Sequence, residues 1–277
     1  MLIADAQVHI WAADTPGRPW PTDRQTPPQK PYPVTKELIL AGMDEAGVDR
    51  VVLVPPSWEG DRNDVALEAA HQHPSRFAVM GRIALEDASN RELIASWRDQ
   101  PGMLGIRCTF HADVHRQMLA DGSAGWLWEA AERAAVPIMV YVPGSVALID
   151  AVAERHPGLK LIIDHLAVGG RKDDEAFARL PEVVRLSRFE NVAVKASALP
   201  LFSSEPYPYR NIHGYIRQVY DAFGPARMFW GTDWTRLPCP WRQAVTLMTE
   251  ELPWLTAADK EQIMGRAICS YLGWAPD

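Results

Sequence analysis

A chain of 277 residues, 47% of them hydrophobic, can bury a sizeable core as one large barrel domain or two small domains. Its net charge of -7 and its pI of about 5.6 exclude the clustered basic face that nucleic-acid binding requires. We therefore expect no nucleic-acid partner. Because no window is apolar enough to span a bilayer, we expect no membrane partner either.

The N-terminus and the cysteines favour a cytoplasmic protein. Residues 1–6 (MLIADA) lack the basic, apolar and small-residue segments of a signal peptide. Cys108, Cys239 and Cys269 are odd in number, far apart and without CxxC spacing, which argues against a disulfide framework and a zinc knuckle. We therefore expect a reducing compartment; the sequence leaves homo-oligomer formation open.

The first predicted strand, residues 2–10 (LIADAQVHI), carries Gln7 and His9 two positions apart. Side chains with this spacing share one face of a strand, so both would point together at the mouth of a barrel. A histidine that only packs inside the protein is the alternative for His9. Residues 11–34 follow with seven prolines and no periodic pattern, which predicts a long irregular loop of the kind that often serves as a lid.

From Thr35, a plausible helix N-cap, helical and strand patterns alternate along the chain. The chain contains eight strand patterns, near residues 2–10, 50–55, 77–83, 103–107, 137–142, 159–164, 191–196 and 227–231. Amphipathic helical segments are expected at 35–47, 63–73, 89–100, 124–135, 145–156, 175–187, 210–223, 240–249 and 256–272.

Continuous apolar strands that alternate with helices indicate a parallel sheet covered on its outer face. Eight such strands in a chain of this length predict an α/β protein, a single-domain (β/α)8 TIM barrel over residues 1–277. A doubly wound open sheet is the alternative. It requires a glycine-rich turn after an early strand, and residues 7–11 (QVHIW) do not provide one.

The eighth strand ends on an acid, within residues 228–234 (MFWGTDW). A carboxylate at the point where a barrel strand becomes a loop lies where barrel enzymes keep their chemistry, so Asp233 is our first candidate general base. The alternative is an aspartate that only caps the next turn.

Polar residues collect at the other predicted strand ends as well, and in a barrel all of them would face one mouth. This set comprises Gln7, His9, Ser57, Arg62, Asn63, Arg82, Arg107, Tyr141, Asp164, His165, Lys195, Ser197, Thr232 and Asp233. A carboxylate opposite cations and imidazoles suits the hydrolysis of an ester, lactone or amide. Since no GxSxG motif is present and no cysteine adjoins a candidate base, water is the expected nucleophile.

These motifs resemble the amidohydrolase superfamily. The resemblance is carried in chain order by residues 5–11 (DAQVHIW), 56–57 (PS), 63–64 (ND), 105–107 (GIR), 164–166 (DHL), 195–197 (KAS) and 231–234 (GTDW), which together span nearly the whole chain. Within the superfamily they are most similar to the amidohydrolase 2 branch, which holds 2-pyrone-4,6-dicarboxylate lactonase and sugar-lactone hydrolases.

The resemblance implies roles for individual residues. Asp233 would accept a proton from the attacking water, and His9 and His165 would flank the scissile carbonyl. The carbonyl or carboxylate oxygens of the substrate would be bound by Arg107, Tyr141 and Ser57. Arg82 and Lys195 complete the expected substrate-binding set, and because guanidinium groups grip carboxylates with two bonds, the set suits an anionic lactone or carboxylate.

The sequence departs from the family pattern at Gln7, which stands where the first histidine of a metal-binding HxH pair is expected. An amide is a poor ligand beside imidazole and carboxylate, so we favour a metal-free site. The alternative is one divalent cation, Zn²⁺ or Mn²⁺, held by His9, His165 and Asp233.

Three functions remain open from the sequence. The first is a lactone hydrolase that acts on a small anionic or sugar-derived lactone. The second is a decarboxylase or hydratase of the same superfamily, which would depend more strongly on a tightly held metal. The third is a non-catalytic barrel that only binds a ligand.

Overall fold

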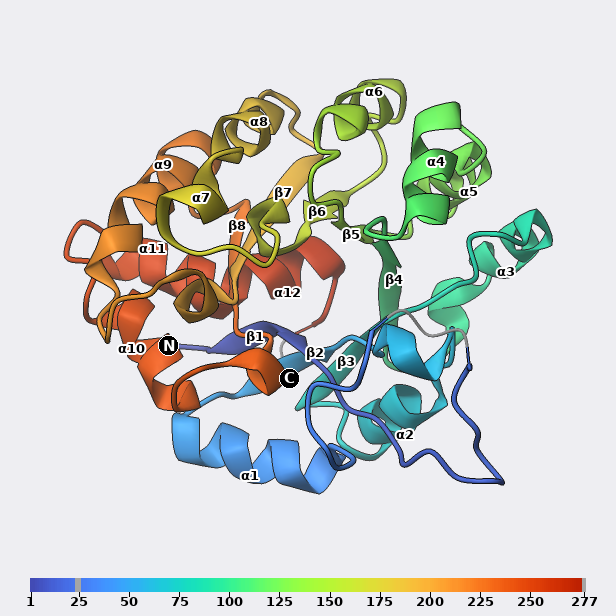
Figure 1. Ribbon diagram of the computed structural model, residues 1–277, viewed down its shortest axis with the longest axis horizontal. Helices are drawn as coiled ribbons and strands as arrows, with labels where there is room; N and C mark the ends of the chain where they lie inside the picture. The colour runs from blue at the N-terminus through green and yellow to red at the C-terminus, as the bar shows by residue number, and fades with distance from the viewer. Residues whose placement is uncertain (23–25, 276–277) are drawn as a thin grey trace.

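The computed structural model describes residues 1–22 and 26–275 and shows the predicted (β/α)8 barrel. Eight strands form a sheet in the order of the chain, each parallel to the next, and helices surround it (Figure 1). The strands are β1 (Ala4–Val8), β2 (Arg50–Leu53), β3 (Phe77–Gly81), β4 (Met103–Thr109), β5 (Ile138–Tyr141), β6 (Leu161–Ile163), β7 (Val192–Ser197) and β8 (Met228–Gly231). The predicted fold class is confirmed.

The helices lie close to the predicted segments. They are α1 (Lys36–Ala46), α2 (Asp64–Gln72), α3 (Arg91–Ile94), α4 (Asp113–Asp121), α5 (Gly125–Arg133), α6 (Ala147–Arg155), α7 (Asp173–Phe177), α8 (Leu180–Arg185), α9 (His213–Phe223), α10 (Trp241–Thr249), α11 (Ala257–Glu261) and α12 (Ala267–Leu272). None of the described helices is long and apolar enough to cross a membrane. Helix α4 was not predicted, because it is a mostly polar segment in which Leu119 is the one buried residue.

The core has an inner and an outer part. Small and medium side chains of the strands, such as Ala4, Ala6 and Met80, fill the barrel interior together with Ile268 of α12 and the nearby Trp274. The opposite faces of the strands pack against the surrounding helices in a larger cluster. The interior is packed at the end where the strands begin, and a pocket opens at the other end, where the strands give way to loops.

An irregularity in β1 decides which of its side chains reach the mouth. Ala4 and Ala6 point into the barrel, but Val8 and Ile10 pack in the outer cluster. The β1–β2 register shifts between Asp5 and Val8, which moves the alternation by one residue. Gln7 and His9 consequently take over the interior face, as their shared spacing predicted.

Asp5 joins the two ends of the sheet. Its buried carboxylate accepts from the backbone N–H of Gln7 (2.9 Å) and of Thr232 (2.9 Å), from the Thr232 hydroxyl, and from Trp241 Nε1 (3.1 Å). The Asp233 N–H donates to the Gln7 carbonyl at 2.9 Å in the same place. Asp5 therefore holds β1 beside β8 directly below the candidate general base.

Thr26 and Gln29, in the segment after β1, reach the mouth of the barrel. The ends of this segment are joined by an antiparallel bridge between Trp11 and Val34. Arg18 fastens it to the barrel through ion pairs with the buried Glu59 (3.3 Å from Nε) and with Asp64. Residues 23–25 of the predicted proline-rich loop lie outside the described residues, so the interpretation as a lid stays a prediction.

We expect Asp5→Ala to lower the free energy of unfolding by about 3 kcal/mol or more. The substitution leaves several buried donors without an acceptor, and each such donor costs about 1–3 kcal/mol. Chemical denaturation measures the change, and Glu154→Ala on the exposed face of α6 is the control. A loss under 1 kcal/mol for Asp5→Ala would show that Asp5 does not hold the barrel closed.

Candidate active site

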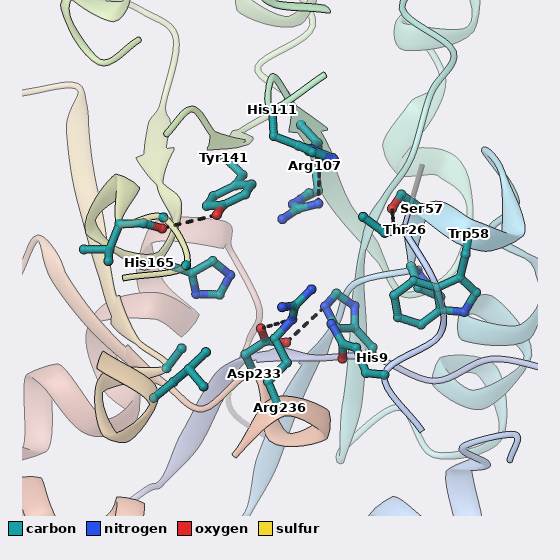
Figure 2. A pocket seen from close by; sticks show the side chains of 18 of the residues that line it. His9, Thr26, Ser57, Trp58, Arg107, His111, Tyr141, His165, Asp233 and Arg236 are labelled. Atoms are coloured by element: carbon teal, nitrogen blue, oxygen red, sulfur yellow. Dashed lines mark hydrogen bonds and ion pairs between the residues drawn. The ribbon is translucent and has the colours of Figure 1, made fainter. Parts of the chain in front are cut away.

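A pocket of about 210 Å³ opens at the carboxyl ends of the strands (Figure 2). Figure 2 shows the His9–Asp233 pair between His165 on one side and Trp58 on the other. Six of the predicted site residues line the pocket: His9, Ser57, Arg107, Tyr141, His165 and Asp233.

His9 is held so that one ring nitrogen faces Asp233. Nδ1 lies 2.6 Å from the Val54 carbonyl, which can only accept, so Nδ1 carries a proton. Nε2 lies 3.1 Å from Asp233 Oδ1 and 3.2 Å from Gln7 Nε2. An unprotonated Nε2 accepts from the Gln7 amide and a protonated Nε2 donates to Asp233, so His9 has a partner in both states.

Asp233 occupies a strained and strongly charged position. Its φ of 52° and ψ of 50° place a non-glycine residue in the left-handed region as the chain leaves β8. Burial raises the pKa of Asp233, but the hydrogen bond from His9 and the charges of His9, His165 and Arg236 lower it well below its usual range. The carboxylate is therefore ionised at neutral pH.

His165 faces the pocket from the end of β6. Its φ of 52° is also left-handed, and Leu166 follows with a φ of 53°, so the chain turns sharply after Asp164. Nδ1 lies 2.8 Å from the Ser197 hydroxyl. Burial, opposed by the charges of Asp233 and Asp164, lowers the pKa of His165 to about 4. The ring is neutral at pH 7, and when Ser197 donates to Nδ1, Nε2–H is available to a substrate oxygen.

Arg107 is fixed by a buried acid beneath the pocket. Its Nε donates to Asp164 Oδ2 at 3.0 Å, and its Nη1 donates to the Thr109 hydroxyl. The guanidinium carbon lies 5.7 Å from the centre of the Tyr141 ring. The Tyr141 hydroxyl donates to the Val168 carbonyl at 3.2 Å. Arg107 and Tyr141 thus present a fixed cation and a hydroxyl to the same side of the pocket.

Two predicted substrate-binding residues do not line this pocket. Lys195 is fully buried beneath it, with Nζ 2.7 Å from Asp164 Oδ1 and in contact with Gln7 Oε1. Arg82 lines a neighbouring cavity instead, near Asp61. Both side chains are cationic and close to the mouth, as expected, but neither stands beside His9 and His165 in the pocket wall.

The donor set does not fit a divalent metal. Gln7 presents its amide nitrogen toward His9, because its oxygen accepts from the Lys195 ammonium. A cation is therefore already built into the place that a metal-binding pair would serve. Among the described residues no three histidine, cysteine, aspartate or glutamate side chains converge as a metal site. We accordingly derive no chemical step through a metal.

The sequence analysis missed several pocket residues. Arg236 follows Asp233 by three positions, and its Nε lies 3.3 Å from Asp233 Oδ2. Trp58 and His111 line the pocket from loops after β2 and β4, and Thr26 reaches it from the segment after β1. Arg236 could have been predicted, because it follows the candidate general base by one turn. The loop residues could not, because loop conformation does not follow from periodicity.

Comparison with known proteins assigns the family. A family model described as amidohydrolase matches residues 4–267. The chain therefore belongs to the amidohydrolase family, and the predicted resemblance is confirmed. It is an enzyme of this family, and its relatives include hydrolases of lactones.

Two relatives and one solved structure illustrate what the chain is similar to. An L-fucono-1,5-lactonase of Burkholderia ambifaria is 28% identical over 83% of this chain and 79% of its own length. A 4-sulfomuconolactone hydrolase of Hydrogenophaga intermedia is 27% identical over 83% of this chain and 73% of its own. An amidohydrolase of Burkholderia multivorans with bound zinc superposes with a TM-score of 0.81 at 21% identity, covering 99% of both chains.

We expect His165 to stay neutral down to about pH 4, whereas an ordinary histidine titrates near pH 6.5. Because the folded pKa is the lower one, this residue favours the folded state above pH 6.5, and that contribution is lost as pH falls from 6.5 to 4. Ring nitrogen-15 NMR measures the titration, with His165→Gln used to assign the signal. A midpoint near pH 6.5 would contradict the buried environment described for this ring.

Proposed function

We propose that this protein hydrolyses a small anionic or sugar-derived lactone, with water as the nucleophile and Asp233 as the general base. The observation that carries the proposal is the ionised Asp233 carboxylate held 3.1 Å from His9 Nε2 and facing a pocket shared with His165 and Arg107. The names of the two relatives support lactones as the substrate class.

The first step uses Asp233 and His9 together. A water between the carboxylate and the lactone carbonyl gives its proton to Asp233 as its oxygen attacks the carbonyl carbon. A carboxylate of low pKa is a weak base, so the neighbouring His9 Nε2 is important: it can receive the proton and then donate to Asp233. The Val54 carbonyl keeps the ring oriented while this proton moves.

The carbonyl oxygen needs donors as its negative charge develops. The neutral His165 can offer Nε2–H while its Nδ1 accepts from Ser197, and the Arg107 cation, fixed by Asp164, adds a favourable potential. Such donors act most strongly when they are already oriented before the reaction. Ser57 can then contact a remaining oxygen of the substrate, and Tyr141 can do so when its hydroxyl leaves the Val168 carbonyl.

Ring opening completes the reaction. The tetrahedral adduct collapses, the bond from the carbonyl carbon to the ring oxygen breaks, and the leaving oxygen takes the proton stored on the Asp233–His9 pair. One water is consumed and one hydroxy acid is formed. These steps employ only side chains of this protein, and we propose that hydrolysis needs no bound metal.

The free cysteines support the expected reducing compartment, the cytoplasm.

Asp233→Asn should lower kcat for lactone hydrolysis by at least about 100-fold, the usual contribution of a general base. The amide is nearly isosteric but cannot accept the proton. Lactone hydrolysis followed by acid release measures the effect, circular dichroism checks the fold, and the exposed Asp99→Asn is the matched control. Activity retained within threefold in Asp233→Asn would remove this residue from the mechanism.

Prolonged chelation should leave the rate of lactone hydrolysis unchanged, because the Gln7–Lys195 contact supplies a cation where the family otherwise uses a metal. Activity is measured together with elemental analysis of the dialysed protein. Inactivation that Zn²⁺ or Mn²⁺ reverses would contradict the metal-free proposal and would favour a metal-dependent lactone hydrolase.

A further inference from the structure

A second cavity adjoins the candidate active site. It has a volume of about 520 Å³ and lies between the loops that follow β2, β3 and β4. Four residues line both cavities: Ser57, Arg107, Thr109 and His111. A ligand that fills the first cavity can therefore extend past Arg107 into the second one.

Arg82 lies in the wall of this second cavity, and its guanidinium group is only partly hydrogen-bonded by the described residues. Only 10% of its side chain is exposed. Nε lies 3.4 Å from Asp61 Oδ1, but Nη1 has no hydrogen-bond partner among the described residues. Burial and the nearby Arg107 guanidinium lower the pKa of Arg82, against the effect of Asp61. A buried donor without an acceptor, close to a second cation, is a costly arrangement unless a ligand completes it.

His111 stands where the two cavities meet, on the same side of the pocket as Arg107 (Figure 2). Neither ring nitrogen has a hydrogen-bond partner within residues 1–22 and 26–275. Burial first, and then the charges of Arg107, His115 and Arg82, lower the pKa of His111. The ring therefore lies in a region of positive potential, with a nitrogen free for a ligand.

The acids of this cavity already have basic partners. Asp61 pairs with Arg82, and Glu86 lies 2.6 Å from His115 Nε2. They do not supply the second acceptor that Arg82 Nη1 lacks. A neutral hydroxyl group could satisfy that donor, but it would not reduce the repulsion between Arg82 and Arg107. A carboxylate or sulfonate would do both.

We propose that the second cavity binds an oxyanion carried by the substrate, with Arg82 and His111 as its ligands. The lactone carbonyl then lies at His9, His165 and Asp233, and the anionic substituent points past Arg107. The inference rests on the proposed function and narrows it, because it selects a carboxylated or sulfonated lactone over a neutral sugar lactone.

The test compares two lactones of equal ring size, one with and one without a carboxylate substituent. Wild type should prefer the carboxylated lactone in kcat/KM. Arg82→Gln and His111→Gln should each reduce that preference about tenfold, mainly through KM, because a charge-assisted hydrogen bond is lost. Arg133→Gln on the exposed face of α5 should keep the preference. An unchanged preference in both cavity variants would overturn the inference.

Direct binding separates this inference from the proposed function. Malonate, a small dicarboxylate, is titrated calorimetrically into wild type, Arg82→Gln and His111→Gln, each checked for folding by circular dichroism. Binding that weakens about tenfold in the variants supports the oxyanion site even if no lactone is hydrolysed. Equal binding by all three proteins, or none by wild type, contradicts it even if hydrolysis is fast. Since His111 is half-buried and makes no described hydrogen bond, its variant remains informative if Arg82→Gln does not fold.

Discussion

The buried ammonium group of Lys195 is the constraint on which the site depends. A charge without solvent must be paired, and Asp164 lies 2.7 Å away for that purpose. The ammonium can only donate, so it fixes the Gln7 oxygen toward itself and the Gln7 amide toward His9. Nε2 of His9 is thereby left between an amide donor and the carboxylate of Asp233. In the proposed mechanism, the His9–Asp233 pair at the end of this chain of contacts accepts the proton of the attacking water.

The same acid also orients the pocket. Asp164 binds Arg107 at 3.0 Å with its second oxygen, and burial of Asp164 is outweighed by Lys195 and Arg107, which lower its pKa. One buried carboxylate thus places a cation under the His9–Asp233 pair and another in the pocket wall. The left-handed backbone at His165 and Asp233 belongs to this arrangement, because strain of this kind persists only where the surrounding structure imposes it. Lys195 on β7 and Arg107 on β4 therefore hold two positive charges below and beside the pocket.

The sequence predicted the barrel and the convergence of His9, His165 and Asp233, because period-two strands and the common orientation of parallel strands place such residues at one rim. It could not predict how deep each side chain lies. Lys195 and Arg107 both occupy strand positions that face the barrel interior. Lys195 is nevertheless buried below the pocket while Arg107 lines it, because the depth of a side chain depends on strand register. Arg82 was correctly expected near the mouth, but its separate cavity is formed by loops, whose shape composition does not determine.

The central claim is that Asp233 activates water and does not attack the substrate itself. A single turnover with enzyme in excess, in water enriched in oxygen-18, distinguishes the two directly. The account predicts that the hydroxy acid from the first turnover carries one heavy oxygen in its carboxylate. A first-turnover product without the label, its new oxygen taken from the Asp233 side chain, would contradict it.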